Sequence, residues 1–173
     1  MADKSSALAA MLPRLKKTDL SPLVRMASGL VPRVLDPFFK SLDEKEKRAI
    51  DKVMPPGKGN RIYIHLVDTA TPPIVVELAQ PMKMTTMPEK DVKQQEIRGI
   101  RLTTDDIQLL AKGRSPGTTL RLLWRFKGQT FTLLSIVWMF MPLLRLGPSG
   151  LRNMGSKLTS RWKPLLDLFA RLK

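Results

Sequence analysis

The order of apolar and polar positions along the chain predicts a central sheet with helices before and after it. Residues 61–67 alternate with the two-residue period of a half-buried strand, and the apolar stretch at 74–79 is expected to be a second strand. A turn at residues 68–73 separates these strands, so they should pair as a hairpin. Further elements are expected in this order: a strand at 82–87, a polar loop at 88–95, a strand at 96–102 and a strand at 124–127.

Apolar residues spaced three and four positions apart predict helices before the first strand and after the fourth. Before the sheet, helices are expected at residues 7–15, from Ser21 onward with interruptions at Pro32 and Pro37, and at 38–53. After the fourth strand, Thr103 and Thr104 precede Asp105 and Asp106, as in the capped start of a helix. This helix should be short, because Gly113 follows a basic last turn.

Residues 131–144 contain no charged side chain, and their apolar side chains surround a helix instead of forming one stripe. A helix of this kind is either buried in protein or in contact with lipid. The segment is shorter than the about 20 apolar residues that a membrane span requires, and Pro142 lies near its end. We therefore expect a helix buried inside the domain, with a re-entrant membrane segment as the alternative.

The last segment, residues 147–173, is expected to be a linker at 147–150 followed by a basic amphipathic helix, which Pro164 can split. One stripe of the helix is apolar and consists of Leu151, Met154, Leu158, Trp162, Leu165, Phe169 and Leu172. The side chains expected to dock this helix on a membrane are Arg152, Lys157, Arg161, Trp162, Lys163, Phe169 and Arg171.

These elements predict an α+β fold, in which helices cover one side of a mostly antiparallel sheet of about five strands. A chain of 173 residues, 43% of them hydrophobic, is long enough to bury one ordinary core. We expect an N-terminal helical extension at residues 1–37, the sheet-containing domain at 38–146 and the basic helix at 147–173.

The net charge of +15 comes from 30 Lys and Arg against 15 Asp and Glu, and it should draw the protein toward anionic partners. Those partners are either the phosphates of nucleic acid or the headgroups of an acidic membrane. Aromatic residues are few and lie mostly in apolar surroundings, which argues against nucleic acid. The first residues lack the apolar core of a secretory signal. We expect a cytoplasmic protein that associates peripherally with membranes.

Candidate catalytic groups are scarce. The chain has no Cys, which excludes disulfides and Cys-based metal sites, and its one histidine, His65, is interpreted as a half-exposed residue of a strand. Asp105 and Asp106 point about 100° apart on a helix, so capping explains them better than a paired-carboxylate site. No phosphate-binding loop, dinucleotide fingerprint or nucleophile elbow is present. We expect a non-enzymatic protein without a metal or cofactor.

Two motifs resemble the sterol-carrier-protein type 2 (SCP-2-like) lipid-binding family. Residues 100–113 are similar to that family's strand followed by an S/T-D-x-D-hydrophobic helix, and Trp-Arg-Phe-Lys-Gly at residues 124–128 is similar to its strand before the last helix. The resemblance covers residues 50–146. It implies an apolar tunnel between sheet and helices, lined by Ile64, Leu66, Val76, Leu78, Ile107, Leu110, Trp124, Phe126, Leu134, Val137, Trp138 and Met141.

The expected function is a lipid-binding carrier that holds a sterol, fatty-acyl or prenyl chain in this tunnel and docks on anionic membranes. Flexible Met residues suit such a cavity, but they would equally fill gaps in a solid core, and the sequence leaves both open. The alternative is a scaffold or accessory subunit of a larger protein complex, with the terminal amphipathic helices as docking elements.

Overall fold

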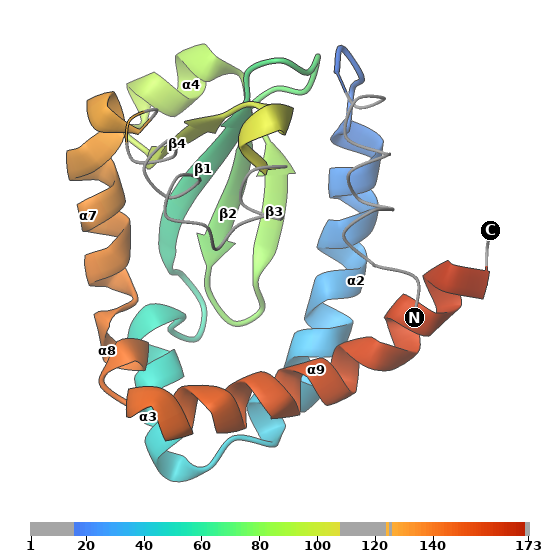
Figure 1. The fold of residues 1–173 in the computed structure, drawn as a ribbon, viewed down its shortest axis with the longest axis vertical. Helices are drawn as coiled ribbons and strands as arrows, with labels where there is room; N and C mark the ends of the chain where they lie inside the picture. The colour runs from blue at the N-terminus through green and yellow to red at the C-terminus, as the bar shows by residue number, and fades with distance from the viewer. Residues whose placement is uncertain (1–15, 108–123, 125, 172–173) are drawn as a thin grey trace.

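The computed structural model describes residues 16–107, 124 and 126–171, with only the backbone described for residue 127 and for residues 161–171. Figure 1 shows the sheet with α7 along one side, α2 along the other, and α9 running past both. The elements in chain order are α2 (Ser21–Lys40), α3 (Glu44–Val53), β1 (Asn60–Leu66), β2 (Ile74–Leu78), β3 (Lys83–Thr86), α4 (Glu89–Gln94), β4 (Arg98–Leu102), the 3-10 helix η1 (Lys127–Gln129), α7 (Thr130–Met139), α8 (Met141–Leu144) and α9 (Gly147–Arg171).

The α+β class is confirmed, and the described residues form a four-stranded mixed sheet in the order β3-β2-β1-β4. The expected hairpin is present, since β1 and β2 are antiparallel with Ile62 opposite Val76. β4, in contrast, pairs with β1 in parallel, with Ile64 opposite Ile100. About five mostly antiparallel strands are therefore not confirmed. The parallel pair arises because the chain crosses from β3, at one edge, to the far side of β1 through α4.

Two sequence expectations about this part of the chain are wrong. The polar loop at residues 88–95 is a helix, α4, whose Lys93 and Glu89 form an ion pair at 3.0 Å one turn apart. Val92, the apolar residue of that helix, is buried and fixes it on the sheet. One inward-facing side chain is too weak a periodic signal to indicate a helix.

The strand expected at residues 124–127 is also wrong in the described part. Trp124 has helical backbone geometry. Phe126 is the residue before the 3-10 helix η1, and the Phe126 carbonyl accepts a hydrogen bond from the Gln129 amide at 2.8 Å. Two apolar residues at a spacing of two fit the pattern of a strand, but they are too few to determine that the segment forms one. Tertiary contacts of the following helix decide the local conformation instead.

The helices before the sheet differ from expectation at their boundaries. α2 is one helix of 20 residues that contains both Pro32 and Pro37, so the expected interruptions are wrong. Val31 and Val34 on its inner face are buried, and this packing outweighs the hydrogen bonds that proline removes. α2 also runs through the boundary expected at residue 37. The helix expected at 7–15 lies outside the described residues.

The helix expected at residues 38–53 is divided between the end of α2 and α3. Asp43 begins α3 with a capping box, in which its carboxylate accepts from the Glu46 amide at 2.9 Å and Glu46 accepts from the Asp43 amide at 3.0 Å. This reciprocal arrangement specifies a helix start. Because this capping box lies inside the apolar pattern of residues 38–53, the segment forms parts of two helices instead of one.

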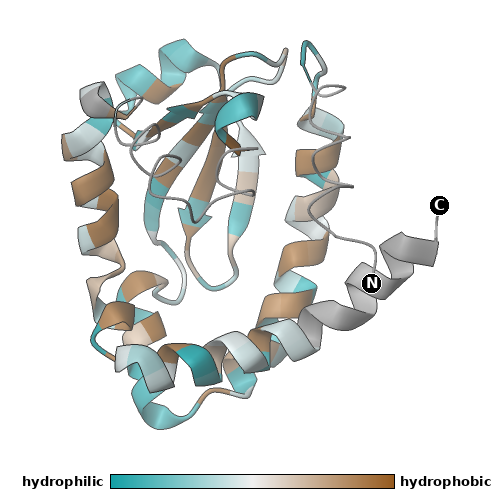
Figure 2. Cartoon of the chain, viewed as in Figure 1, coloured by the Kyte–Doolittle hydropathy of each residue, from teal (hydrophilic) through white to brown (hydrophobic). Residues whose placement is uncertain are grey.

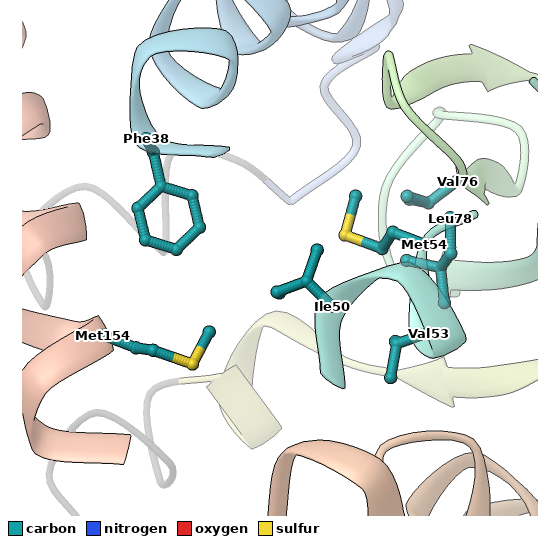
Figure 3. Close-up of a cluster of buried hydrophobic side chains, with 7 residues drawn as sticks. All are labelled: Phe38, Ile50, Val53, Met54, Val76, Leu78 and Met154. Carbon is teal, nitrogen blue, oxygen red and sulfur yellow. The ribbon is translucent and has the colours of Figure 1, made fainter. Parts of the chain in front are cut away.

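The main hydrophobic cluster joins helices from both ends of the chain to the core face of the sheet. Figure 3 shows its buried members, which are Phe38, Ile50, Val53, Met54, Val76, Leu78 and Met154. A second cluster beside β4 contains buried Leu20, Leu66 and Leu102, with Ile64, Ile100, Ile107 and Phe126 packed around it. Because α2 and α9 both contribute to the main cluster, the terminal helices are part of the folded core.

The buried carboxylate of Glu46 holds α9 against α3. It accepts hydrogen bonds from Asn153 Nδ2 at 2.7 Å and from Lys157 Nζ at 2.5 Å, and only 3% of its side chain is exposed. Residues 147–150, expected to be a linker, are the first turn of α9, and the backbone of α9 is helical through Pro164. The burial of Met154 in the main cluster and the contacts with Glu46 of α3 supply the stability that a Gly-rich and Pro-containing helix lacks by itself.

We predict that Glu46→Gln lowers the free energy of unfolding by about 1–3 kcal/mol, because the glutamine keeps the capping geometry but loses the charge that pairs with Lys157. Urea unfolding of both proteins measures the change. Exposed Glu44 on the first turn of the same helix provides a matched control, Glu44→Gln. Equal effects of the two substitutions would contradict a special role for the buried carboxylate.

Candidate functional site

An exposed apolar stripe lies on the outer side of α7 and α8. It consists of Phe131, Leu134, Val137, Trp138 and Leu144, of which Phe131 is 89% and Trp138 67% exposed. Figure 2 shows the hydrophobic colouring of α7 at the edge of the molecule. The expectation that residues 131–144 are buried is wrong, because no residue of α7 or α8, all of which are described, is buried.

The other side of α7 is anchored to the edge strand β4. Gln129, just before α7, accepts a hydrogen bond from the Arg101 amide at 2.7 Å and donates to the Arg101 carbonyl at 3.2 Å. Its side chain thus imitates a neighbouring strand at the open edge. Arg98 of β4 donates to the Ser135 hydroxyl, and Met139 packs against the main cluster. These contacts turn the remaining apolar side chains of α7 outward.

Trp124, which precedes η1, is 75% exposed and is a third large aromatic residue on the surface, after Phe131 and Trp138. Tryptophan combines a large apolar ring system with one N–H donor, and it is enriched where protein meets both lipid and water. Large apolar side chains, two of them tryptophans, are therefore exposed both before and along α7.

The residues implied to line a tunnel are not brought together in one place. Val76 and Leu78 lie in the main cluster, whereas Ile64, Leu66, Ile107 and Phe126 belong to the second cluster. The structure places Trp124, Leu134, Val137 and Trp138 on the surface, and Met141 is half-buried on α8. Leu110 lies outside the described residues.

Two residues of the apolar stripe predicted for the first half of α9 face the core, whereas Leu151, the first residue of that stripe, is exposed. Met154 is buried, Leu158 packs against the main cluster, and Lys157 is bound to Glu46. Of the side chains predicted to dock on a membrane, Arg152 is exposed. The others, Arg161, Trp162, Lys163, Phe169 and Arg171, lie beyond the last described side chain.

A groove with a volume of about 410 Å³ lies between α3 and α8, where the chain leaves α7. Its lining consists of Glu44, Lys45, Arg48, Ala49, Lys52, Pro142, Arg145 and Leu146. Sequence analysis missed this groove, because α3 and α8 are far apart in the chain. The available signal was the spacing of Lys45, Arg48 and Lys52, which puts them on one face of a helix.

The helix start after β4 is confirmed. The Asp106 carboxylate accepts from the Thr103 amide at 2.8 Å, and Asp68 accepts from the Thr104 amide at 3.0 Å. Asp105 instead points to the surface, where it pairs with Lys16 at 3.2 Å. The two adjacent carboxylates are therefore capping and surface groups rather than a pair. The end expected at Gly113 lies outside the described residues.

His65 lies in a small pocket of about 120 Å³ between β1 and α4, where Tyr63, Glu89 and Arg101 also contribute. It is half-buried, as expected, and its Nδ1 atom has no hydrogen-bond partner among the described residues. Burial, with a smaller contribution from the charge of Arg101, lowers the pKa of His65 below 6.5, although Glu89 opposes this shift.

No group of three or more His, Asp or Glu side chains that could hold a metal ion is present in the part of the chain described. Within the same residues, no helix is both long enough and apolar enough to cross a bilayer. The exposed surface of α7 and the groove beside α8 are the candidate sites of the described residues.

We predict that the stability supplied by neutral His65 is present above pH 6.5 and is lost as the pH falls below it. The unfolded chain takes up a proton near pH 6.5, whereas the folded chain resists protonation because its pKa is lowered. Since the chain has one histidine, the difference in unfolding free energy between wild type and His65→Gln isolates this effect. A difference that stays constant as the pH falls from about 7.5 to about 5.5 would refute it.

No protein-family model matches the chain, and no curated protein or solved structure matches it. The resemblance of its motifs to the SCP-2-like family therefore stays a prediction.

Proposed function

We propose that the protein binds peripherally to anionic lipid membranes, with the apolar stripe of α7 and α8 inserted among the acyl chains. The observation that carries this proposal is a charge-free helix with Phe131, Leu134 and Trp138 on its open side. Large apolar side chains in a row on a surface indicate contact with an apolar phase or partner.

Two favourable terms act together in this mode of binding. Burial of an exposed aliphatic or aromatic side chain contributes about 1.5–3 kcal/mol when it is complete, so partial insertion of the five-residue stripe contributes several kcal/mol. Each Lys or Arg close to an acidic surface adds about 1 kcal/mol, and the net charge of +15 supplies many such residues. Reversible anchoring needs both signals, because either alone is marginal.

Charge complementarity favours a lipid surface over a protein partner as the occupant. Arg145 follows the stripe directly after α8, and Lys45 and Arg48 lie next to it across the groove. At a membrane surface, the cations would contact anionic headgroups while the neighbouring apolar helix contacts the acyl chains. The scaffold alternative depended on the terminal stripes, and in α9 Met154 and Leu158 already pack inside the protein.

Carriage of a lipid chain in an interior tunnel is a finer proposal, and it rests on the family resemblance. Its support in the fold is limited to the second cluster, where Ile64, Leu66 and Phe126 meet below β4. Membrane binding through α7 does not depend on such a tunnel. Organic extraction and mass spectrometry of the purified protein test carriage alone, whereas flotation with vesicles tests membrane binding.

We predict that the variant Phe131→Ser, Leu134→Ser, Trp138→Ser loses roughly 100-fold in partitioning onto vesicles of phosphatidylcholine and phosphatidylglycerol, because about 1 kcal/mol of insertion is lost for each side chain. Flotation with the vesicles measures the partitioning. The fold should persist, since all three side chains are more than half exposed.

Leu23→Ser with Met26→Ser is the control, because these apolar residues are also more than half exposed but lie on α2, on the other side of the molecule. The control protein should float as the wild type does. Equal losses in the two variants, or full binding by the α7 variant, would contradict insertion through the stripe.

A further inference from the structure

The groove between α3 and α8 is strongly cationic. Four basic residues and one acidic residue line it, which gives a net charge of +3. Lys45, Arg48 and Lys52 come from one face of α3, and Arg145 comes from the end of α8. The four cations converge from two helices, and such convergence is unfavourable unless an anion compensates it.

None of these four basic side chains forms an ion pair within the described part of the chain. Glu46 is on the same helix, but its carboxylate is buried on the α9 side, where Asn153 and Lys157 use it. Glu44, at the start of α3, is the one carboxylate in the groove lining. The cations therefore remain available to a ligand from outside.

We infer that this groove binds the phosphate headgroup of an anionic membrane lipid, an inference that rests on the proposed membrane association. Arg48 and Arg145 carry planar guanidinium groups that suit bidentate contacts with phosphate oxygens, and Lys45 adds a point charge. The volume of about 410 Å³ lies in the range of small-molecule sites.

A lipid fits the groove better than free phosphate does, because part of its lining is apolar. Ala49, Pro142 and Leu146 form that part and have no use in binding an inorganic anion. They suit the glycerol and the first methylene groups of a lipid. Leu144 belongs to the exposed apolar stripe and lies in α8, as Pro142 of the groove does. The headgroup and the acyl chains would therefore be held by adjoining surfaces.

The test compares Lys45→Gln, Arg48→Gln, Arg145→Gln with a control variant of equal charge loss, Lys58→Gln, Lys83→Gln, Lys90→Gln. All six side chains are exposed, and Lys83 lies on β3, at the sheet edge opposite β4. Binding is measured on phosphatidylcholine vesicles that contain either phosphatidic acid or oleate, adjusted to the same surface potential.

We expect the wild type and the control variant to prefer phosphatidic acid over oleate, and the groove variant to bind phosphatidic acid roughly 10- to 100-fold more weakly and lose that preference. The charge-conserving variant Arg48→Lys, Arg145→Lys should also lose much of the preference, because it keeps the field but not the bidentate contacts. Equal losses in the groove and control variants would overturn the inference in favour of a nonspecific field.

Inorganic phosphate separates the two sources of the anion. If it protects the wild type against thermal unfolding as well as a short-chain phosphatidic acid does, the groove binds free phosphate and the lipid assignment is overturned. Failure here is distinguishable from failure of the proposed function. A groove variant that binds all vesicles normally refutes only the groove, whereas normal binding by the α7 serine variant refutes insertion.

Discussion

The buried carboxylate of Glu46 is the interaction that determines how the helices are arranged. A carboxylate removed from water is tolerated only when it is paired, and here its partners come from α9, more than a hundred residues away in the chain. The pairing brings Met154 over Phe38 and closes the main cluster on the core face of the sheet. α2, α3 and α9 consequently cover the core face of the sheet, against which a further helix would otherwise be buried.

The exposure of α7 follows from this arrangement. β4 is the open edge of the described sheet, and Gln129 caps the backbone of Arg101 at that edge. α7 is thereby held beside β4 by its Ser135 side, while Phe131 and Trp138 remain in water. A folded protein that keeps such side chains exposed gives up part of its possible hydrophobic stabilisation. That stabilisation is recovered when an apolar phase covers the helix.

Local patterns predicted what local interactions determine. The hairpin of β1 and β2 and the cap at Thr103 and Asp106 were predictable, because alternation and capping act over a few residues. The parallel pairing of β4 and the packing of α4 on the sheet through Val92 depend on partners distant in sequence, so no local pattern specifies them. For residues 131–144, the apolar composition indicated that the helix is either buried in protein or in contact with lipid. It is not buried because other helices already fill the core, which the composition could not show.

The candidate site shows the same division between local and distant signals. The charge run of α3 has the pattern of an ordinary solvated face, and the spacing that puts Lys45 and Arg48 on one face of the helix does not say what lies opposite them. They become a site because α8 brings Arg145 and Pro142 opposite them, next to the apolar stripe. Insertion of α7 would place this groove at headgroup depth, where cations gain most from phosphate. Apolar insertion and phosphate contact would then reinforce each other, since each holds the other's surface at the membrane.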